Sequence, residues 1–310
     1  IAYPDGTSQS VGVDGFGQIA SITDQAGATT SYGYDGLGRI ARIDYPAGDT
    51  TAWAPKIYTY GYSADARGMG GNHWVRTSTQ GNLSLRTDFD ALLRPVLSTT
   101  ADASTGALAV SSRTEYDWAG RKTFDSYPVN GTPDRAAIVL GITTAYDVLG
   151  RPTVTTQSSE QGDLTTATSY PSGGARQVTD AKGNVTTTHY QAFDEPSFES
   201  AVRVDAPEGV VQTIARNVLG DVLSVTQGDV TRTTTYDSQH RVCRSWEPET
   251  GSNMTAYDAA DNVIWSASGQ SFNGEGCGYD QVAEASKTIS SYDAMNRVTA
   301  VTYPSGTLAT

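Results

Sequence analysis

Aspartate is the chemically active residue that this sequence repeats most regularly. It directly follows tyrosine in six copies of a repeated motif, at Asp35, Asp117, Asp147, Asp237, Asp258 and Asp293, and once more at Asp280. Carboxylates brought together could bind calcium, and the segment DAADN at Asp258–Asn262 has the densest oxygen ligands, but it lacks the twelve-residue pattern of an EF-hand loop. The aspartates also fall in separate short segments. We therefore interpret them as turn-forming residues and expect no metal site.

The other reactive residue types are few and scattered. His73, His189 and His240 are the three histidines, which is too sparse a set for a zinc site or a catalytic triad. The sequence has no G-x-S-x-G, P-loop or H-E-x-x-H motif. Cys243 and Cys277 match no metal-binding spacing, and we expect two buried thiols rather than a disulfide. The sequence thus predicts no catalytic residues, no cofactor and no enzyme.

Composition and charge narrow the class of protein. The 310 residues carry a formal net charge of −13 and a sequence pI of about 4.5, which disfavours nucleic acid and anionic membranes as partners. No segment is apolar enough to span a bilayer, so we expect no membrane insertion. Hydrophobic residues make up 37% of the chain, and Thr, Ser, Val and Tyr are frequent. This composition predicts thin β-sheets rather than a thick core.

A repeated unit organises the chain. The segments YDGLGR at Tyr34–Arg39, YDWAGR at Tyr116–Arg121 and YDVLGR at Tyr146–Arg151 are its clearest copies. Weaker copies include VDGFGQ, FDALLR and NVLGD. Asp14 and Asp35 lie one unit of about twenty residues apart, and other gaps are longer, as expected for a repeat architecture with insertions.

Hairpin chemistry explains the motif. The Asp can open a type I turn by accepting a backbone N–H two residues on, and the Gly supplies the positive φ that follows. Asn296 and His240 replace that Gly in two copies. Because the Tyr and the Arg flank the turn, we expect them to face each other across the ladder, with the Arg lying on the ring of its own motif. The Tyr-Pro-x-Gly segments that follow end the strands.

The predicted site residues are therefore structural, and they all belong to the repeated turns. They are Tyr34, Asp35, Gly38, Arg39, Tyr116, Asp117, Gly120, Arg121, Tyr146, Asp147, Gly150, Arg151, Tyr236, Asp237, Arg241, Tyr257, Asp258, Tyr292, Asp293 and Arg297.

The repeat predicts an all-β fold of antiparallel hairpins with on the order of two dozen strands. No linker divides the chain, so we expect one continuous domain over residues 1–310. The segments AYPDGT and TYPSGT stand at the two ends in the same phase of the repeat. We expect the chain to be a segment of a longer protein, truncated mid-repeat at both ends. DQVAEASKTIS at Asp280–Ser290 could form a short helix.

Tyr-Asp-x-x-Gly-Arg with intervening Tyr-Pro-x-Gly resembles the YD repeat of Rhs proteins, a family related to the B/C components of Tc toxins and to teneurins. The resemblance covers essentially the whole chain. It implies a β-ribbon that spirals into a hollow shell, which in bacterial members encloses a toxic C-terminal domain. This chain departs from the pattern where Asp261-Asn262 replaces Gly-Arg. It also lacks the self-cleaving core segment of the family, so no catalytic residue is carried over.

Two functions remain open at this point. The first is a structural, non-catalytic segment of a bacterial shell that encapsulates a toxin or other cargo, with the remaining YD repeats of the same protein as partners. The second is an extracellular adhesin or fibre that binds carbohydrate or a cell-surface partner. The five Trp residues are spread along the sequence, which favours carbohydrate only weakly. Either function predicts a secreted or cell-surface protein.

Overall fold

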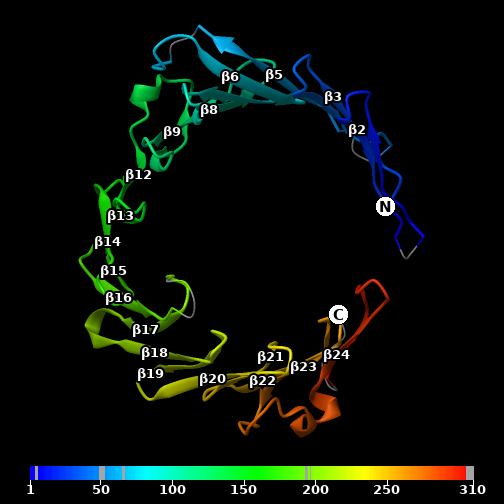
Figure 1. Ribbon diagram of the computed structural model, residues 1–310, viewed down its shortest axis with the longest axis vertical. Helices are drawn as coiled ribbons and strands as arrows, with labels where there is room; N and C mark the ends of the chain where they lie inside the picture. The colour runs from blue at the N-terminus through cyan, green and yellow to red at the C-terminus, as the bar shows by residue number, and fades with distance from the viewer. Residues whose placement is uncertain (4–5, 49–52, 65–66, 193–194, 196, 305–310) are drawn as a thin grey trace. The chain divides into compact units, whose positions relative to one another are not determined.

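The computed structural model describes residues 1–310 apart from 4–5, 49–52, 65–66, 193–194, 196 and 305–310. The described residues form 25 strands and four single-turn 3-10 helices (Figure 1). The chain divides into two compact units, residues 1–165 and residues 166–310, each of which is described by itself. The predicted all-β fold of antiparallel hairpins is confirmed, and the single continuous domain stays a prediction.

The first unit is a succession of antiparallel strands in chain order, with one exception around β11. Strand β9 pairs with β8, β10 and β11, and strand β10 pairs with β9 and β12. Its strands are β1 (Ser10–Val13), β2 (Ile19–Thr23), β3 (Thr29–Tyr34), β4 (Ile40–Asp44), β5 (Lys56–Ser63), β6 (His73–Gln80), β7 (Leu83–Phe89), β8 (Pro95–Asp102), β9 (Val110–Tyr116), β10 (Lys122–Ser126), β11 (Val129–Asn130), β12 (Gly141–Tyr146) and β13 (Pro152–Gln157), with the 3-10 helix η1 (Arg135–Ala137).

The second unit continues the same arrangement, each strand pairing antiparallel with the next from β14 to β25. Its strands are β14 (Leu164–Ser169), which begins just before the unit boundary, β15 (Ala175–Thr179), β16 (Val185–Tyr190), β17 (Ala201–Asp205), β18 (Val211–Arg216), β19 (Val222–Gln227), β20 (Val230–Tyr236), β21 (Val242–Glu247), β22 (Gly251–Tyr257), β23 (Val263–Gln270), β24 (Thr288–Tyr292) and β25 (Val298–Thr302). Its 3-10 helices are η2 (Pro207–Gly209), η3 (Tyr279–Gln281) and η4 (Glu284–Ser286).

A bulge beside the repeated turns fixes the register of most hairpins. The pairing shifts by one residue between Gly33 and Tyr34 in β3, and the same shift occurs between Ala145 and Tyr146 in β12. A type I turn followed by a residue with positive φ produces such a bulge, because the extra residue lets the second strand leave with the right twist. The repeated sequence therefore sets both the turn and the alignment of the strands.

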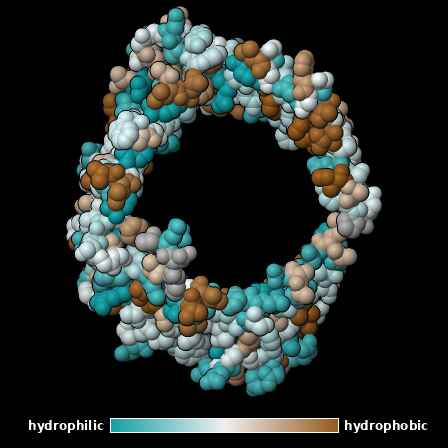
Figure 2. Space-filling view, in the orientation of Figure 1, coloured by the Kyte–Doolittle hydropathy of each residue, from teal (hydrophilic) through white to brown (hydrophobic). Residues whose placement is uncertain are grey.

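Both units are thin, as the composition predicts. Few side chains are fully buried, and those with less than 2% exposure include Leu97, Ile138 and Met254. On the visible face in Figure 2, apolar side chains form separate patches among polar ones. The small amount of core lies where an excursion of the chain covers one face of the sheet.

Each unit has such a cover. In the first unit the two segments at 67–72 and 131–140 meet, since the Arg135 N–H donates to the Arg67 carbonyl at 2.9 Å. In the second unit the segment between β23 and β24 packs Phe272 and Val282 against Met254. The predicted short helix in this segment is limited to the single turns η3 and η4, because β24 begins at Thr288.

The second cover corrects one prediction. Cys243 and Cys277 form a disulfide with a Cα–Cα distance of 5.4 Å, so the expected pair of free thiols is wrong. Their sequence separation of 34 fits no known spacing, so the sequence did not predict the pairing. The segment after β23 folds back over β21, and this return brings the two sulfur atoms together.

Candidate functional site: the Tyr-Asp turns

The repeated turns are the most regular constellation of polar side chains in the molecule, and we call them Tyr-Asp turns. The turn at Asp35 shows their geometry. Asp35 and Arg39 begin and end it, with the Asp35 N–H donating to the Arg39 carbonyl at 2.9 Å. Asp35 Oδ1 accepts the N–H groups of Leu37 at 2.9 Å and Arg39 at 3.0 Å. Asp35 Oδ2 accepts Arg39 Nε at 2.7 Å, so one carboxylate closes the whole turn.

The same closure recurs along the chain. In five further turns the carboxylate of the first residue accepts a hydrogen bond from Nε of the Arg four residues later. These aspartates are Asp90, Asp117, Asp147, Asp237 and Asp293. At Asp258 the side-chain amide of Asn262 replaces the guanidinium, at 2.9 Å. In the turn that begins at Asn217 the amide is the first residue and the acid is the last, and Asn217 Nδ2 donates to the Asp221 carboxylate at 2.9 Å.

These contacts stabilise the ionised carboxylates. The backbone N–H of Arg39 and then its side chain hold the pKa of Asp35 below its usual value. The backbone N–H of the corresponding Arg likewise lowers the pKa of Asp147 and of Asp293. The aspartates therefore serve as acceptors for the turn and are poorly suited to act as proton donors or bases near neutral pH.

The position before the Arg requires a left-handed backbone. Gly38 has φ of +78°, as the hairpin chemistry predicts. Leu93, His240 and Asn296 occupy the same position in other copies with φ of 60°, 61° and 60°. The turn therefore imposes this conformation even where the sequence has no Gly.

Consecutive turns are bonded to one another through the Tyr. Its hydroxyl donates to the carbonyl of the residue that directly follows the preceding turn, as in Tyr146 to Lys122 at 2.7 Å and Tyr257 to Val242 at 3.0 Å. The remaining bonds of this kind join Tyr34 to Ile19, Tyr60 to Ile40, Tyr116 to Pro95, Tyr236 to Val222 and Tyr292 to Val263.

The Arg also reaches the next turn, which corrects a prediction. Arg121 was expected to lie on the ring of its own motif, Tyr116, yet its guanidinium lies 4.7 Å from the ring centroid of Tyr146 and donates to the Asp147 carbonyl at 3.3 Å. Arg94 over Tyr116 and Arg241 over Tyr257 repeat this arrangement. Each Arg is held by the Asp of its own turn, and this contact directs the rest of the guanidinium toward the neighbouring turn.

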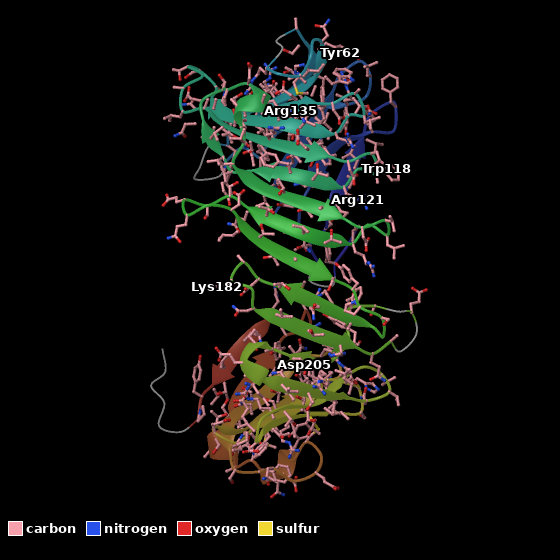
Figure 3. The ribbon with its side chains drawn as sticks, turned by 90° about the vertical axis from the view of Figure 1, so that its left-hand side faces the viewer. Tyr62, Trp118, Arg121, Arg135, Lys182 and Asp205 are labelled. Carbon is pink, nitrogen blue, oxygen red and sulfur yellow. A yellow bond between two sulfur atoms is a disulfide. The ribbon has the colours of Figure 1, made fainter. Side chains whose placement is uncertain are left out.

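The turns of a unit lie in one row. Because successive strands are antiparallel, turns that follow every second strand meet at the same edge of the sheet. This holds for the turns after β1, β3, β7, β9 and β12, and Figure 3 shows Trp118 and Arg121 together at one edge. The two residues at the tip of each of these five turns are exposed, and Trp118 is 91% exposed.

Within the described ranges, no group of three or more His, Cys, Asp or Glu side chains is arranged to hold a metal ion. No helix of the described residues is long and apolar enough to cross a membrane. His240 Nδ1 lies 3.4 Å from Asp221, the residue that ends the neighbouring turn.

One polar cluster was missed by the sequence analysis. Asp88 is fully buried and lies 2.7 Å from both His73 Nε2 and Arg86 Nη2, with Arg67 Nη1 at 3.8 Å. Arg67 belongs to the first cover and donates to Thr99 at 3.0 Å. The available signal was an Arg two residues before an acid in one strand, a spacing that places both on one face.

That spacing recurs in four strands and produces an ion pair each time. The pairs are Arg42 with Asp44, Arg86 with Asp88, Arg113 with Glu115 and Arg203 with Asp205. In the first unit the third pair also holds the cover, because Arg113 donates to the Ile138 carbonyl at 2.9 Å and Glu115 accepts Arg135 at 3.0 Å.

In a comparison with known proteins, a family model matches part of the chain. Residues 13–50, which contain the turns at Asp14 and Asp35, match the model of the RHS repeat. A search of curated proteins found no match. Among solved structures, the chain is similar to one in the crystal structure of TcdB2-TccC3-Cdc42, with 13% identity, 95% of this chain and 19% of that chain covered, and a TM-score of 0.41.

A second similar structure is a Photorhabdus luminescens Tc holotoxin pore that carries a TccC3 mutation. The identity is 12%, with 94% of this chain and 23% of that chain covered, and the TM-score is 0.19. The chain thus spans about a fifth of the length of the solved chains that it matches.

Proposed function

We propose that this chain, which is an Rhs/YD-repeat protein, is a structural and non-catalytic wall segment of a shell that encloses a toxin or another cargo domain and helps to deliver it. Its neighbours in the wall are further Rhs/YD repeats of the same longer protein, with which it forms a single continuous ribbon.

One observation carries the proposal: consecutive hairpins are joined twice. The strand ladders join them first, and the bonds between neighbouring Tyr-Asp turns join them again. Tyr146 donates to the Lys122 carbonyl at 2.7 Å while Arg121 donates back to the Asp147 carbonyl at 3.3 Å. Reciprocal bonds of this kind oppose local opening of the edge, which is the property that a barrier needs.

The sheets also suit a container in their pairing and polarity. Strands β2–β10 and β15–β24 each pair on both sides, so few edges remain for other chains to add to. Thr and Ser line many strands, as in β16 (Val185–Tyr190) and β14 (Leu164–Ser169). A polar wall would let a partly folded cargo lie against it without binding tightly.

We include export in this proposal because of the disulfide. Disulfides form and persist mainly in oxidising surroundings, outside the cytosol. The bond between Cys243 and Cys277 thus supports a secreted or cell-surface protein.

Electron microscopy of the intact native particle tests the proposal. A closed hollow particle with additional density inside is expected, and the cargo domain should resist protease until the shell is opened with denaturant. An open ribbon or a long fibre with the cargo digested from the start would overturn containment and favour the adhesin.

A further inference from the structure

The row of Tyr-Asp turns has a gap in the first unit. The hairpin of β5 and β6 stands between the turn at Asp35 and the turn at Asp90, yet its Tyr60 is followed by Gly-Tyr-Ser rather than by Asp. Tyr60 keeps the usual bond of the motif, since its hydroxyl donates to the Ile40 carbonyl at 3.0 Å. Beyond it the strands continue to the pair Ser63 and His73. A longer hairpin therefore replaces one turn of the row.

A hollow of about 270 Å³ lies at this gap. Arg39 of one neighbouring turn and Leu93 of the other flank it, and the rest of its lining is Tyr60, Trp74, Val75, Arg76 and Phe89. Aromatic walls with a few charged groups are typical of small-ligand sites, and this volume suits a single ring with its substituents.

Aromatic faces are available at the hollow and directly beside it. Tyr62 and Trp74 are cross-strand partners whose rings stack with centroids 4.5 Å apart and an interplanar angle of 17°. Tyr62 is 69% exposed, because the longer hairpin carries it past the neighbouring turns. Tyr62 thus supports the ring of Trp74, which is the one of the two that lines the hollow.

Two guanidinium groups give the hollow a positive charge. Arg39 lies 4.2 Å from the ring centroid of Tyr60 and is paired with Asp35. Arg76 is exposed and lies 5.9 Å from the ring centroid of Phe89, and within the described part of the chain it forms no ion pair. In a chain with a net charge of −13, this unpaired cation is available for an anionic ligand.

We propose that this hollow binds an acidic sugar, a hexuronic or sialic acid residue of a glycan. The apolar C–H face of the pyranose lies against Trp74, whose ring Tyr62 supports by stacking, and its carboxylate is bound by Arg76. The disulfide supports a sugar over a nucleotide, because it indicates an oxidising compartment outside the cytosol, a step that rests on the proposed export.

Titration of the purified protein with N-acetylneuraminic acid, glucuronic acid and glucose, followed by calorimetry and ligand-observed NMR, tests the proposal. The acidic sugars should bind about tenfold more tightly than glucose, since only they offer a carboxylate to Arg76. Arg76→Gln should remove this preference, and Tyr62→Ala should weaken binding of all three sugars by about tenfold.

Matched controls separate binding from folding. Trp118→Ala removes an even more exposed aromatic residue, and Arg232→Gln removes an exposed arginine of the second unit, so neither should change the affinity. Circular dichroism should be the same for all four variants. Absence of saturable binding of both acidic sugars, an unchanged preference in Arg76→Gln, or equally tight binding of adenosine monophosphate would overturn the proposal.

Discussion

The two units cover one face of a thin sheet by different chemistry. In the first unit, charged side chains hold the cover, with Arg67 reaching Asp88 and Arg135 reaching Glu115. In the second, a disulfide and a small apolar cluster around Met254 hold it. The comparison teaches that a ribbon with little core can gain one locally through any long segment that folds back, provided that the segment is fastened.

A second pair of sites makes the comparison quantitative. His73, Asp88 and Arg86 in the first unit have the same chemistry as His189, Asp205 and Arg203 in the second. The His–Asp distances are 2.7 Å and 3.0 Å, and each Arg lies 2.7 Å from its Asp. The Asp88 side chain is 0% exposed, whereas that of Asp205 is 31% exposed. The difference in exposure comes from the first cover, whose Arg67 lies over Asp88.

The largest expected effect comes from removing the buried charge. Asp88→Asn should lower the free energy of unfolding of the first unit by about 4 kcal/mol, because it leaves buried cations without their counter-ion. Hydrogen–deuterium exchange across β6–β9 and urea unfolding measure the change. The matched variant Asp205→Asn should have a far smaller effect, since water solvates its partners. Equal losses in the two variants would contradict burial as the deciding factor.

Removing the disulfide should have the next largest effect, confined to the second unit. The double variant Cys243→Ser/Cys277→Ser should lose about 3 kcal/mol, because the unfolded chain is no longer constrained by the cross-link. Exchange should rise in the segment at 271–287 and in β21–β23, while β6–β9 stay protected. Faster exchange throughout the first unit would show that the two covers are not independent.

Replacing the acid of a single turn should have a smaller, local effect. Asp147→Ala removes the acceptor of Arg151 Nε at 2.7 Å, and Asp258→Ala removes that of the neutral amide of Asn262 at 2.9 Å. Because charge-assisted bonds are the stronger ones, Asp147→Ala should lower the melting temperature more. The backbone amides of Leu149 and Arg151 should also exchange faster in this variant. The reverse order of the two variants would be incompatible with the guanidinium as the main fastener.

Acid should affect both units gradually and alike. The folded pKa of Asp35 and Asp293 lies below the ordinary 3.8, so their stabilisation is fully present above that pH and is lost as the pH falls through the lowered values. Asp102 should titrate last, because its hydrogen-bond donors lower its pKa to about 2, and the largest contribution comes from the Ser104 hydroxyl. Carboxyl NMR shifts and melting curves between pH 5 and about 2 measure this. Ser104→Ala should raise the pKa of Asp102, and a response in one unit alone would contradict the prediction.

The turns could be predicted from the sequence because their bonds are local. Asp35 and Arg39 are four residues apart, and the turn forms between them whatever lies elsewhere. The stacking of Arg121 could not be predicted, because its partner Tyr146 belongs to the next turn and is brought beside it by strand pairing. The Arg-x-Asp spacing was visible in the sequence, but the burial of Asp88 was not.

Local sequence specifies the period of the chain, its all-β character and the form of its turns, since hydrogen bonds within about five residues specify a hairpin. Only the folded chain shows which polar groups are buried, where the disulfide forms and where the row of turns opens into a hollow. These features join residues far apart in the sequence, such as Arg67 with Ser111 and Cys243 with Cys277. Their energies depend on burial, and a cover provides burial only once the chain has folded back over the sheet.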